Sequence, residues 1–201
     1  MRNVSLLGCG KLGFPLGIKL LEDGFNVKGS TTTVQNLQKF IEIGIEPYVL
    51  DAEKQMDSNF FKSDILVLTL PFKKNFEDPH IYKKQIQRVC SYVEPSPIKH
   101  IVFTSSSSVY PKDGLPYEPY SDFIPPNKRA EVLLSCEQII LNIPNISVRI
   151  IRLGGICRDE GKYKSSSFKR RLITQKDSIK LIKECVHDKS DKKCINGFKI
   201  I

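Results

Sequence analysis

A short apolar run followed by a glycine-rich turn opens the chain, and this pair constrains the fold more than any other feature. Asn3–Leu7 has the length and composition of a buried strand. The turn after it, Gly8-Cys9-Gly10-Lys11-Leu12-Gly13, has the spacing G-x-G-x-x-G and leads into a helix-period segment at Leu12–Asp23. In that context the first glycine permits a tight turn, the second lets a pyrophosphate approach the backbone, and the third lets the helix pack closely. The pattern predicts a β-α-β unit that binds a dinucleotide at Gly8, Gly10, Lys11, Leu12 and Gly13, while a turn needed only for packing stays the alternative.

Short apolar runs alternate with helix-period segments along the first 157 residues. This alternation predicts a doubly wound parallel sheet of the Rossmann type, an α/β fold with right-handed crossovers. We expect residues 1–157 to form the dinucleotide-binding domain. Residues 158–201 would be a short basic segment, with a helix near Ser178–Val186 and a strand at Lys193–Asn196, completing a reduced substrate lobe. Further strands are expected at Phe25–Lys28, Ile45–Leu50, Ile65–Leu70, Ile101–Phe103 and Ser147–Leu153, further helices after Thr33, around Ile81–Val93 and at Ala130–Ile140, and a loop at Pro111–Pro126.

Composition and charge exclude several classes of protein. No apolar run approaches the roughly 18 residues of a membrane span, and the first residues reach Gly8 and Lys11 too early for a secretory signal. The six cysteines are scattered without a C-x-x-C pair, which favours reduced thiols and a cytoplasmic protein. Residues 158–201 hold 13 Lys or Arg against 6 Asp or Glu, so the net charge of +9 belongs mainly to this segment. Because no nucleic-acid-binding motif accompanies the charge, a solvated surface is the preferred interpretation.

The end of the second expected strand selects between the two nicotinamide dinucleotides. NAD sites usually carry an Asp or Glu there for the ribose 2′-hydroxyl, but this strand runs into Ser30, Thr31 and Thr32. Such hydroxyls could bind a 2′-phosphate, with charge from Lys28, which favours NADP over NAD. Alternatively they only cap the next helix, a role open to Thr33. After the third and fourth strands, we expect Asp51 to meet the adenine amino group and Leu70-Pro71 to cover the adenosine or ribose.

A serine-rich string after the fifth expected strand carries a family resemblance. Together with the glycine turn, the string resembles the extended short-chain dehydrogenase/reductase superfamily, that is, the NAD-dependent epimerase/dehydratases, and is closest to small atypical members described as nucleoside-diphosphate-sugar epimerase-like. The resemblance covers most of residues 2–198. Its segments are Phe103-Thr104-Ser105-Ser106-Ser107-Ser108-Val109-Tyr110, Glu118-Pro119, Cys136–Ile140, Val148–Ile156 and Ile173–Ile179.

The resemblance implies a catalytic serine, which maps to Ser106, and a Tyr-x-x-x-Lys pair that transfers the proton. None of the seven tyrosines is followed four residues later by a lysine. Counting back four residues from Lys128, the nearest lysine of the expected helix, gives Ile124. A tyrosine without a nearby cation is a poor base at neutral pH. Tyr110 or Tyr120, with charge from Lys128 or Arg129, would have to replace the pair, or the protein binds without reacting.

Two functional hypotheses therefore stay open. In the first, the chain oxidises, reduces or epimerises a small sugar-like or nucleotide-linked substrate by hydride exchange with NADP or NAD. In the second, it is a catalytically silent dinucleotide-binding sensor or partner module. The resemblance also implies a homodimer. Basic residues near the end of the sequence could clamp a substrate diphosphate through bidentate guanidinium groups, or they only keep the surface soluble. A β-hydroxyacid dehydrogenase shares the glycine turn but lacks the serine string. The basic residues are Arg158, Lys164, Lys169, Arg170 and Arg171.

Overall fold

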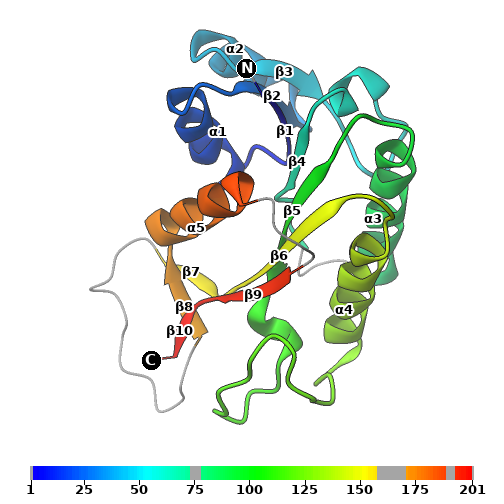
Figure 1. Cartoon of the computed structure of the whole chain (residues 1–201), viewed down its shortest axis with the longest axis vertical. Helices are drawn as coiled ribbons and strands as arrows, with labels where there is room; N and C mark the ends of the chain where they lie inside the picture. Colours follow the sequence, from blue (N-terminus) through cyan, green and yellow to red (C-terminus); the bar gives the residue numbers. More distant parts are fainter. Residues whose placement is uncertain (1, 73–77, 158–170, 189–192, 201) are drawn as a thin grey trace.

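A seven-stranded parallel sheet forms the centre of the computed structural model (Figure 1), which describes residues 2–72, 78–157, 171–188 and 193–200. The strand order is β3-β2-β1-β4-β5-β6-β9, and every neighbouring pair is parallel. This order, with its reversal between β1 and β4, is that of a doubly wound Rossmann sheet, so the expected fold class is confirmed. The strands are β1 (Asn3–Leu7), β2 (Asn26–Thr31), β3 (Glu46–Val49), β4 (Ile65–Leu68), β5 (His100–Ser106), β6 (Ser147–Leu153) and β9 (Lys193–Gly197).

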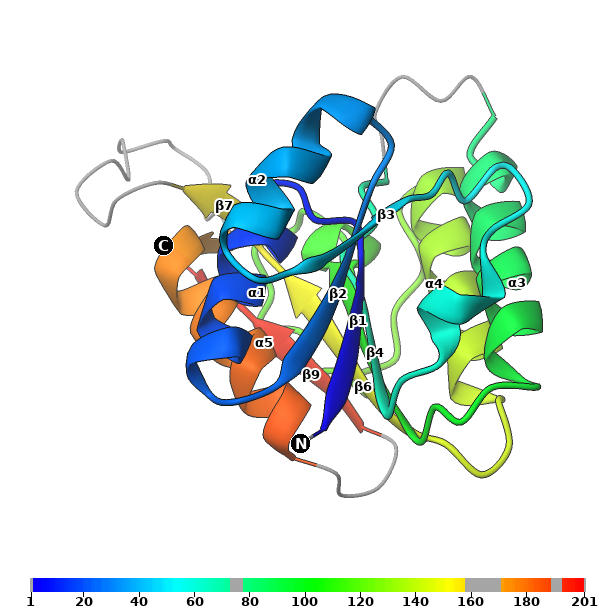
Figure 2. The same ribbon diagram turned by 90° about the horizontal axis from the view of Figure 1, so that it is seen from above.

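Helices cover both faces of the sheet, as Figure 2 shows from above. The helices α1 (Gly13–Glu22) and α5 (Gln175–His187) contact each other on one face, together with the short α2 (Leu37–Glu42). The helices α3 (His80–Val93) and α4 (Lys128–Leu141) pack together on the opposite face. The sheet is thus shielded from solvent on both sides, as parallel sheets generally are.

The central strand β4 is apolar at every position, without an alternation of polar and apolar residues. All four of its residues are buried. Because successive side chains point to opposite faces of a strand, Ile65 and Val67 enter the core under α1 and α5, whereas Leu66 and Leu68 enter the core under α3 and α4. Two separate cores therefore require a strand that is apolar on both sides.

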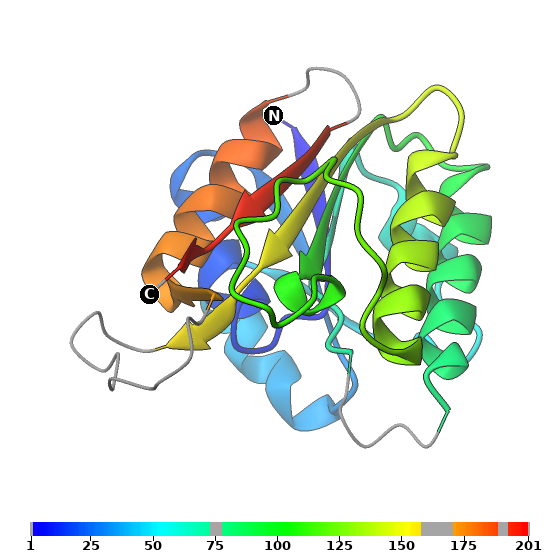
Figure 3. The same ribbon diagram turned by 90° about the horizontal axis from the view of Figure 1, so that it is seen from below.

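The C-terminal elements extend this sheet and add a small one. β9 pairs with β6, and β7 (Gly155–Cys157), β8 (Arg171–Thr174) and β10 (Lys199–Ile200) form a three-stranded sheet beside it. Thr174 caps α5, since its hydroxyl oxygen accepts a hydrogen bond from the N–H of Asp177 at 3.0 Å. Residues 111–126 contain no helix or strand, as expected, and Figure 3 shows this loop crossing β6 and β9.

Two local expectations differ from the structure. β5 runs on through Ser106, because its pairing with β6 continues to Ser106 opposite Leu153, so part of the serine string is strand. The segment after Thr33 begins as a single 3-10 turn, and the Thr33 side chain accepts no capping hydrogen bond from it. The hydroxyl oxygen of Thr33 instead accepts a hydrogen bond from Asn36 Nδ2 at 2.8 Å. None of the helices in the described part of the chain is long and apolar enough to cross a membrane.

Candidate cofactor site

A cavity of about 730 Å³ opens at the carboxyl ends of the central strands. It lies where the order of the sheet reverses between β1 and β4, the place at which doubly wound folds bind their ligands. Its wall combines the glycine turn, the end of β2, the segments after β3 and β4, the serine string and one side of α4. Eleven of the twelve residues expected at the cofactor and catalytic sites line it: Gly8, Gly10, Lys11, Leu12, Ser30, Thr31, Thr32, Asp51, Leu70, Pro71 and Ser106.

The three glycines of the turn have the separate roles that the sequence predicts. Gly8 has a φ of 104°, a left-handed conformation that favours glycine. A Cβ on Gly10 would meet no atom within 4 Å, so this residue leaves open space against the cavity. A Cβ on Gly13, the expected residue that does not line the cavity, would lie 2.4 Å from the carbonyl oxygen of Gly8. Gly13 is therefore required by the close packing of the helix start on the turn.

The start of α1 offers hydrogen-bond donors to an anion. Within the described residues, the N–H groups of Lys11, Leu12 and Gly13 have no protein acceptor, whereas the N–H of Phe14 donates to the carbonyl oxygen of Gly10 at 3.1 Å. Free N–H groups and the positive end of a helix attract a phosphate. The open space at Gly10 and these donors fit the pyrophosphate of a dinucleotide.

Hydroxyl groups at the end of β2 are held by neighbouring groups. The buried Ser30 Oγ accepts a hydrogen bond from the N–H of Gly8 at 2.8 Å, which fixes the glycine turn. Thr31 Oγ1 accepts from the N–H of Thr33 at 3.2 Å, and Thr32 is exposed beside it. Lys28, expected to add charge here, does not line the cavity: its Nζ donates to the carbonyl oxygen of Asn59 at 2.6 Å.

Residues beyond β3 and β4 form the wall on the expected adenosine side. Asp51 lines the cavity, and one of its carboxylate oxygens accepts from the N–H of Glu53 at 2.9 Å. Glu53 in turn accepts a hydrogen bond from Gln85 Nε2 at 3.0 Å, and both residues line the same cavity. Sequence patterns gave no signal for Gln85, because nothing in the sequence shows which turn of α3 faces the cavity.

The serine string supplies the opposite wall. Thr104, Ser105, Ser106 and Ser108 line the cavity. Ser106 Oγ accepts a hydrogen bond from the N–H of Ser108 at 3.2 Å and stays half-buried, so its hydroxyl faces the site that the resemblance implies for it. Ser105 is buried and donates to a carboxylate of α4.

The resemblance implies a tyrosine and a lysine of this helix at the cavity, but helix α4 places two other residues there. Arg129 and Leu133 line the cavity at the four-residue spacing expected of Tyr and Lys, whereas Lys128 does not line it. Asn127 caps the helix by accepting from the N–H of Ala130 at 3.0 Å, and Val132, Cys136 and Ile140 of the helix pack in the core. The guanidinium of Arg129 lies 3.5 Å from the Phe72 ring centroid and donates to the Phe72 carbonyl, and its burial lowers its pKa.

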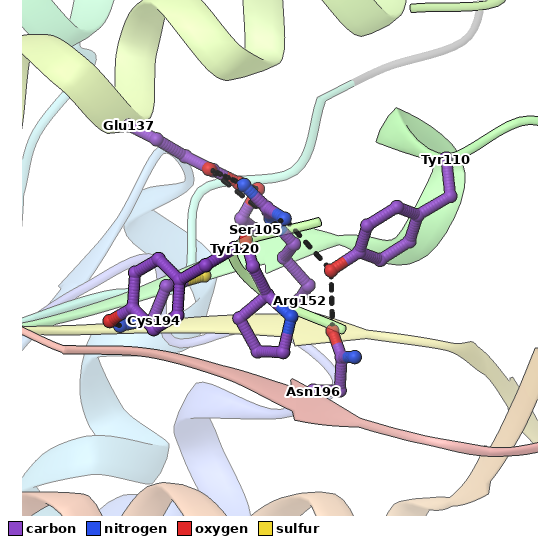
Figure 4. A network of polar contacts seen from close by, with 8 residues as sticks. Ser105, Tyr110, Tyr120, Glu137, Arg152, Cys194 and Asn196 are labelled. Atoms are coloured by element: carbon purple, nitrogen blue, oxygen red, sulfur yellow. Dashed lines mark hydrogen bonds and ion pairs between the residues drawn. The ribbon is translucent and has the colours of Figure 1, made fainter. Parts of the chain in front are cut away.

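A buried ion pair between β6 and α4 holds the serine string in place. Arg152 of β6 and Glu137 of α4 approach to 2.7 Å, with side chains only 7% and 2% exposed (Figure 4). Ser105 donates to the same carboxylate at 2.5 Å. Arg152 also donates to the Tyr110 hydroxyl at 2.8 Å, and that hydroxyl donates to Asn196 of β9 at 2.8 Å. One guanidinium thus joins the serine string, α4 and the last strand of the sheet.

Three side chains expected at the substrate form hydrogen bonds within the protein, and the first of them belongs to this network. Tyr110 is buried within it, and desolvation raises the pKa of its hydroxyl, which keeps that hydroxyl protonated at neutral pH. The Tyr120 hydroxyl accepts from the N–H of Cys194 on β9 at 3.0 Å. Arg171 donates to the carbonyl oxygens of Pro111 and Leu115, so it holds the loop that contains them. The other basic residues of that expectation, Arg158, Lys164, Lys169 and Arg170, lie outside the described residues.

Thiols and imidazoles contribute little to the cavity. Burial raises the pKa of Cys9 in the glycine turn to about 12, so its thiol stays protonated at neutral pH. Within the described residues, no histidine lines the cavity, and no group of three or more His, Cys, Asp or Glu side chains could hold a metal ion.

Breaking the ion pair from one side should be far more costly than removing both partners. Arg152→Met or Glu137→Leu alone should lower the free energy of unfolding by about 3–5 kcal/mol, because each leaves a buried charge unpaired. The double variant should lose less than the sum of the two. Chemical denaturation measures all three, and strict additivity would contradict the proposed coupling.

The matched control is the exposed pair formed by Lys19 and Glu22, whose charged atoms lie 2.8 Å apart. Their side chains are 52% and 54% exposed. Lys19→Met and Glu22→Leu should each change the free energy of unfolding by only about 0–1 kcal/mol through loss of this contact.

Comparison with solved structures identifies the fold. UDP-N-acetylglucosamine 4-epimerase from Bacillus cereus superposes with a TM-score of 0.81 at 18% identity, over 100% of this chain and 80% of that chain. UDP-glucose 4-epimerase from Bifidobacterium longum, in complex with NAD+ and UDP, gives 0.76 at 15% identity, over 98% and 77%. ADP-L-glycero-D-manno-heptose-6-epimerase from Helicobacter pylori gives 0.78 at 13% identity, over 98% and 76%. The chain therefore has the fold of the extended short-chain dehydrogenases/reductases, that of the NAD-dependent epimerases.

A curated relative is more similar in sequence. Protein YeeZ of Escherichia coli strain K12 is 32% identical over 162 residues, which are 78% of this chain and 59% of the relative. The match thus spans somewhat more than half of that protein's length. The same relative from strain O157:H7 matches equally. No protein-family model matches the chain.

Proposed function

We propose that this chain binds a nicotinamide dinucleotide in the 730 Å³ cavity, with NADP preferred over NAD. The glycine turn carries the proposal, because it combines open space at Gly10 with three N–H groups that lack a described protein acceptor. Support comes from the fold of NAD-dependent epimerases and from the position of the cavity at the reversal of strand order.

The preference for NADP rests on the end of β2. Ser30, Thr31 and Thr32 line the cavity there, in the place where NAD-binding folds usually carry a carboxylate for the ribose hydroxyls. A carboxylate would repel a 2′-phosphate, whereas hydroxyl groups can donate hydrogen bonds to it. The nearest acid in the wall, Asp51, follows the next strand, β3, and already accepts from the N–H of Glu53.

Calorimetric titration of the whole chain with NADP and with NAD tests the binding proposal. We expect saturable binding of both and a lower Kd for NADP. Equal dissociation constants would contradict the NADP preference while leaving dinucleotide binding intact. A flat titration with both ligands would overturn the proposed function itself.

Substitution of alanine for Gly10 and for Gly13 distinguishes an effect on dinucleotide binding from an effect on stability. Gly10→Ala should change the free energy of unfolding little, because its Cβ meets open space, but should weaken dinucleotide binding about tenfold or more by filling the pyrophosphate approach. Gly13→Ala should instead lower the free energy of unfolding by about 1–3 kcal/mol through the contact with Gly8. Denaturation and titration of both variants check this contrast. Unchanged affinity in a folded Gly10→Ala protein would remove the pyrophosphate site.

Hydride exchange with a sugar or nucleotide-linked substrate is a second candidate function. The observation that favours it is Ser106, which lies in the cavity wall where the resemblance implies a hydrogen bond to the substrate oxygen. Arg129 would add positive charge on the opposite wall. The alternative is a module that binds the dinucleotide without catalysing a reaction. It is favoured because Arg129 and Leu133 line the cavity at the four-residue spacing at which the resemblance implies a tyrosine and a lysine.

A spectroscopic assay distinguishes the enzyme from the silent module. The chain is mixed with reduced or oxidised NADP and a set of UDP-sugars, and the absorbance of the reduced nicotinamide is followed. Turnover that falls at least about tenfold in Ser106→Ala would support hydride exchange, because the loss of a hydrogen bond to a reacting oxygen raises the barrier. Ser108→Ala, altered in the same wall, serves as the control. Cofactor binding without any exchange would favour the silent module.

A further inference from the structure

The carbonyl oxygen of Lys11, in the glycine turn, lacks the hydrogen-bond donor that a regular helix would give it. At the start of α1, the N–H groups of Phe14 and Leu16 donate to the carbonyl oxygens four residues earlier, each at 3.1 Å. By the same pattern the carbonyl of Lys11 would accept from residue 15, which is a proline. Because proline carries no backbone N–H, the sequence leaves this one carbonyl of the turn without its helical partner.

A side chain from a distant part of the sequence supplies the missing donor. Gln175, the first residue of α5, donates from Nε2 to the carbonyl oxygen of Lys11 at 2.8 Å. The side chain of Gln175 is half-buried, and the cap formed by Thr174 fixes the start of the helix from which it extends. The last helix is therefore joined to the turn that carries the expected pyrophosphate donors.

This hydrogen bond acts on a peptide group whose other side faces the cofactor cavity. The peptide between Lys11 and Leu12 is planar and trans, so its carbonyl and its N–H point in opposite directions. Holding the carbonyl from the side of α5 therefore directs the N–H of Leu12 the other way. Leu12 lines the cofactor cavity, and its N–H has no protein acceptor among the described residues. A hydrogen bond to the carbonyl also polarises the peptide, which strengthens its N–H as a donor.

Polar contacts join α5 to α1 and its flanking residues at both ends of the two helices, which lie side by side (Figure 2). At the near end, Gln175 contacts the glycine turn. At the far end, Lys183 Nζ and His187 Nε2 contact the two carboxylate oxygens of Asp23, directly after α1, at 2.8 and 3.0 Å. An effect on the packing of α5 can therefore be distinguished from an effect on the turn itself.

We propose that Gln175 is a positioning residue of the dinucleotide site. It replaces the donor that Pro15 lacks and holds the Lys11–Leu12 peptide so that the N–H of Leu12 faces the pyrophosphate. This inference rests on the proposed dinucleotide binding. It extends the cofactor site to a residue that lies 164 positions after Lys11 and does not line the cofactor cavity. Because NAD and NADP share the pyrophosphate, Gln175 affects the binding of both alike.

Calorimetric titration of variants of the whole chain with NADP and with NAD tests this role. Gln175→Met keeps the length of the side chain but removes its donor, and it should weaken the binding of both cofactors by about three- to tenfold. The matched control is Lys183→Met, which breaks the contact of the same helix with Asp23 at the far end. This control should lower the free energy of unfolding, measured by chemical denaturation, but leave both dissociation constants unchanged.

Restoring the helical donor should rescue the lost affinity. Pro15→Ala introduces a backbone N–H four residues after Lys11, where it can donate to the Lys11 carbonyl as the N–H groups of Phe14 and Leu16 do to theirs. Added to Gln175→Met, this substitution should return both dissociation constants to within about twofold of the wild-type values. On its own it should change them little. If Gln175 served only the packing of α5, Pro15→Ala would not compensate for its loss.

The outcomes distinguish this inference from the proposed function. Suppose that wild-type protein binds the dinucleotides. The positioning role is then overturned, while dinucleotide binding stands, if Gln175→Met binds them as tightly as wild type, if Pro15→Ala fails to rescue the loss, or if Lys183→Met causes the same loss. If wild-type protein binds neither cofactor, the proposed function is overturned and the positioning role with it.

Discussion

The buried pair of Arg152 and Glu137 connects the parts of this molecule that make its cavity. Two opposite charges removed from water are stable only when each finds a partner and further hydrogen bonds. Ser105 and Tyr110 supply those bonds, and through them the pair fixes the serine wall and the last strand of the sheet. The cofactor cavity therefore depends on a contact that lies outside it, between β6 and α4.

The cavity lies at the carboxyl ends of the strands of a fold shared with NAD-dependent epimerases, and α4 presents other side chains to it than those that the family resemblance implies. A tyrosine and a lysine one turn apart would supply a proton and a cation to the reacting centre. Arg129 supplies a cation and Leu133 supplies only apolar surface. Tyr110, which the sequence offers as a substitute, serves the buried network instead. The residues expected to hold the dinucleotide line the cavity, Gly13 excepted, whereas α4 carries no Tyr-x-x-x-Lys pair.

Local patterns predicted the features that depend on neighbours in sequence. The strands Asn3–Leu7 and Ser147–Leu153 and the glycine turn follow from apolar runs and φ requirements, and the structure confirms them. Contacts between distant segments could not be predicted. The side of α4 that faces the cavity depends on the packing of Val132, Cys136 and Ile140 against distant segments of the core. The hydrogen bond from Asn36 to the Thr33 hydroxyl depends on the shape of a turn, which no periodicity reveals.

The reversal of strand order between β1 and β4 has a consequence for how such a protein can change over generations. The crevice there is created by the path of the backbone, since consecutive crossovers leave in opposite directions. No side chain has to be absent for it to exist, so residues in its wall can be exchanged while the two cores stay intact. A lineage can then lose one chemistry and acquire another without passing through an unfolded intermediate. The arginine and leucine on α4 are what such an exchange would leave behind.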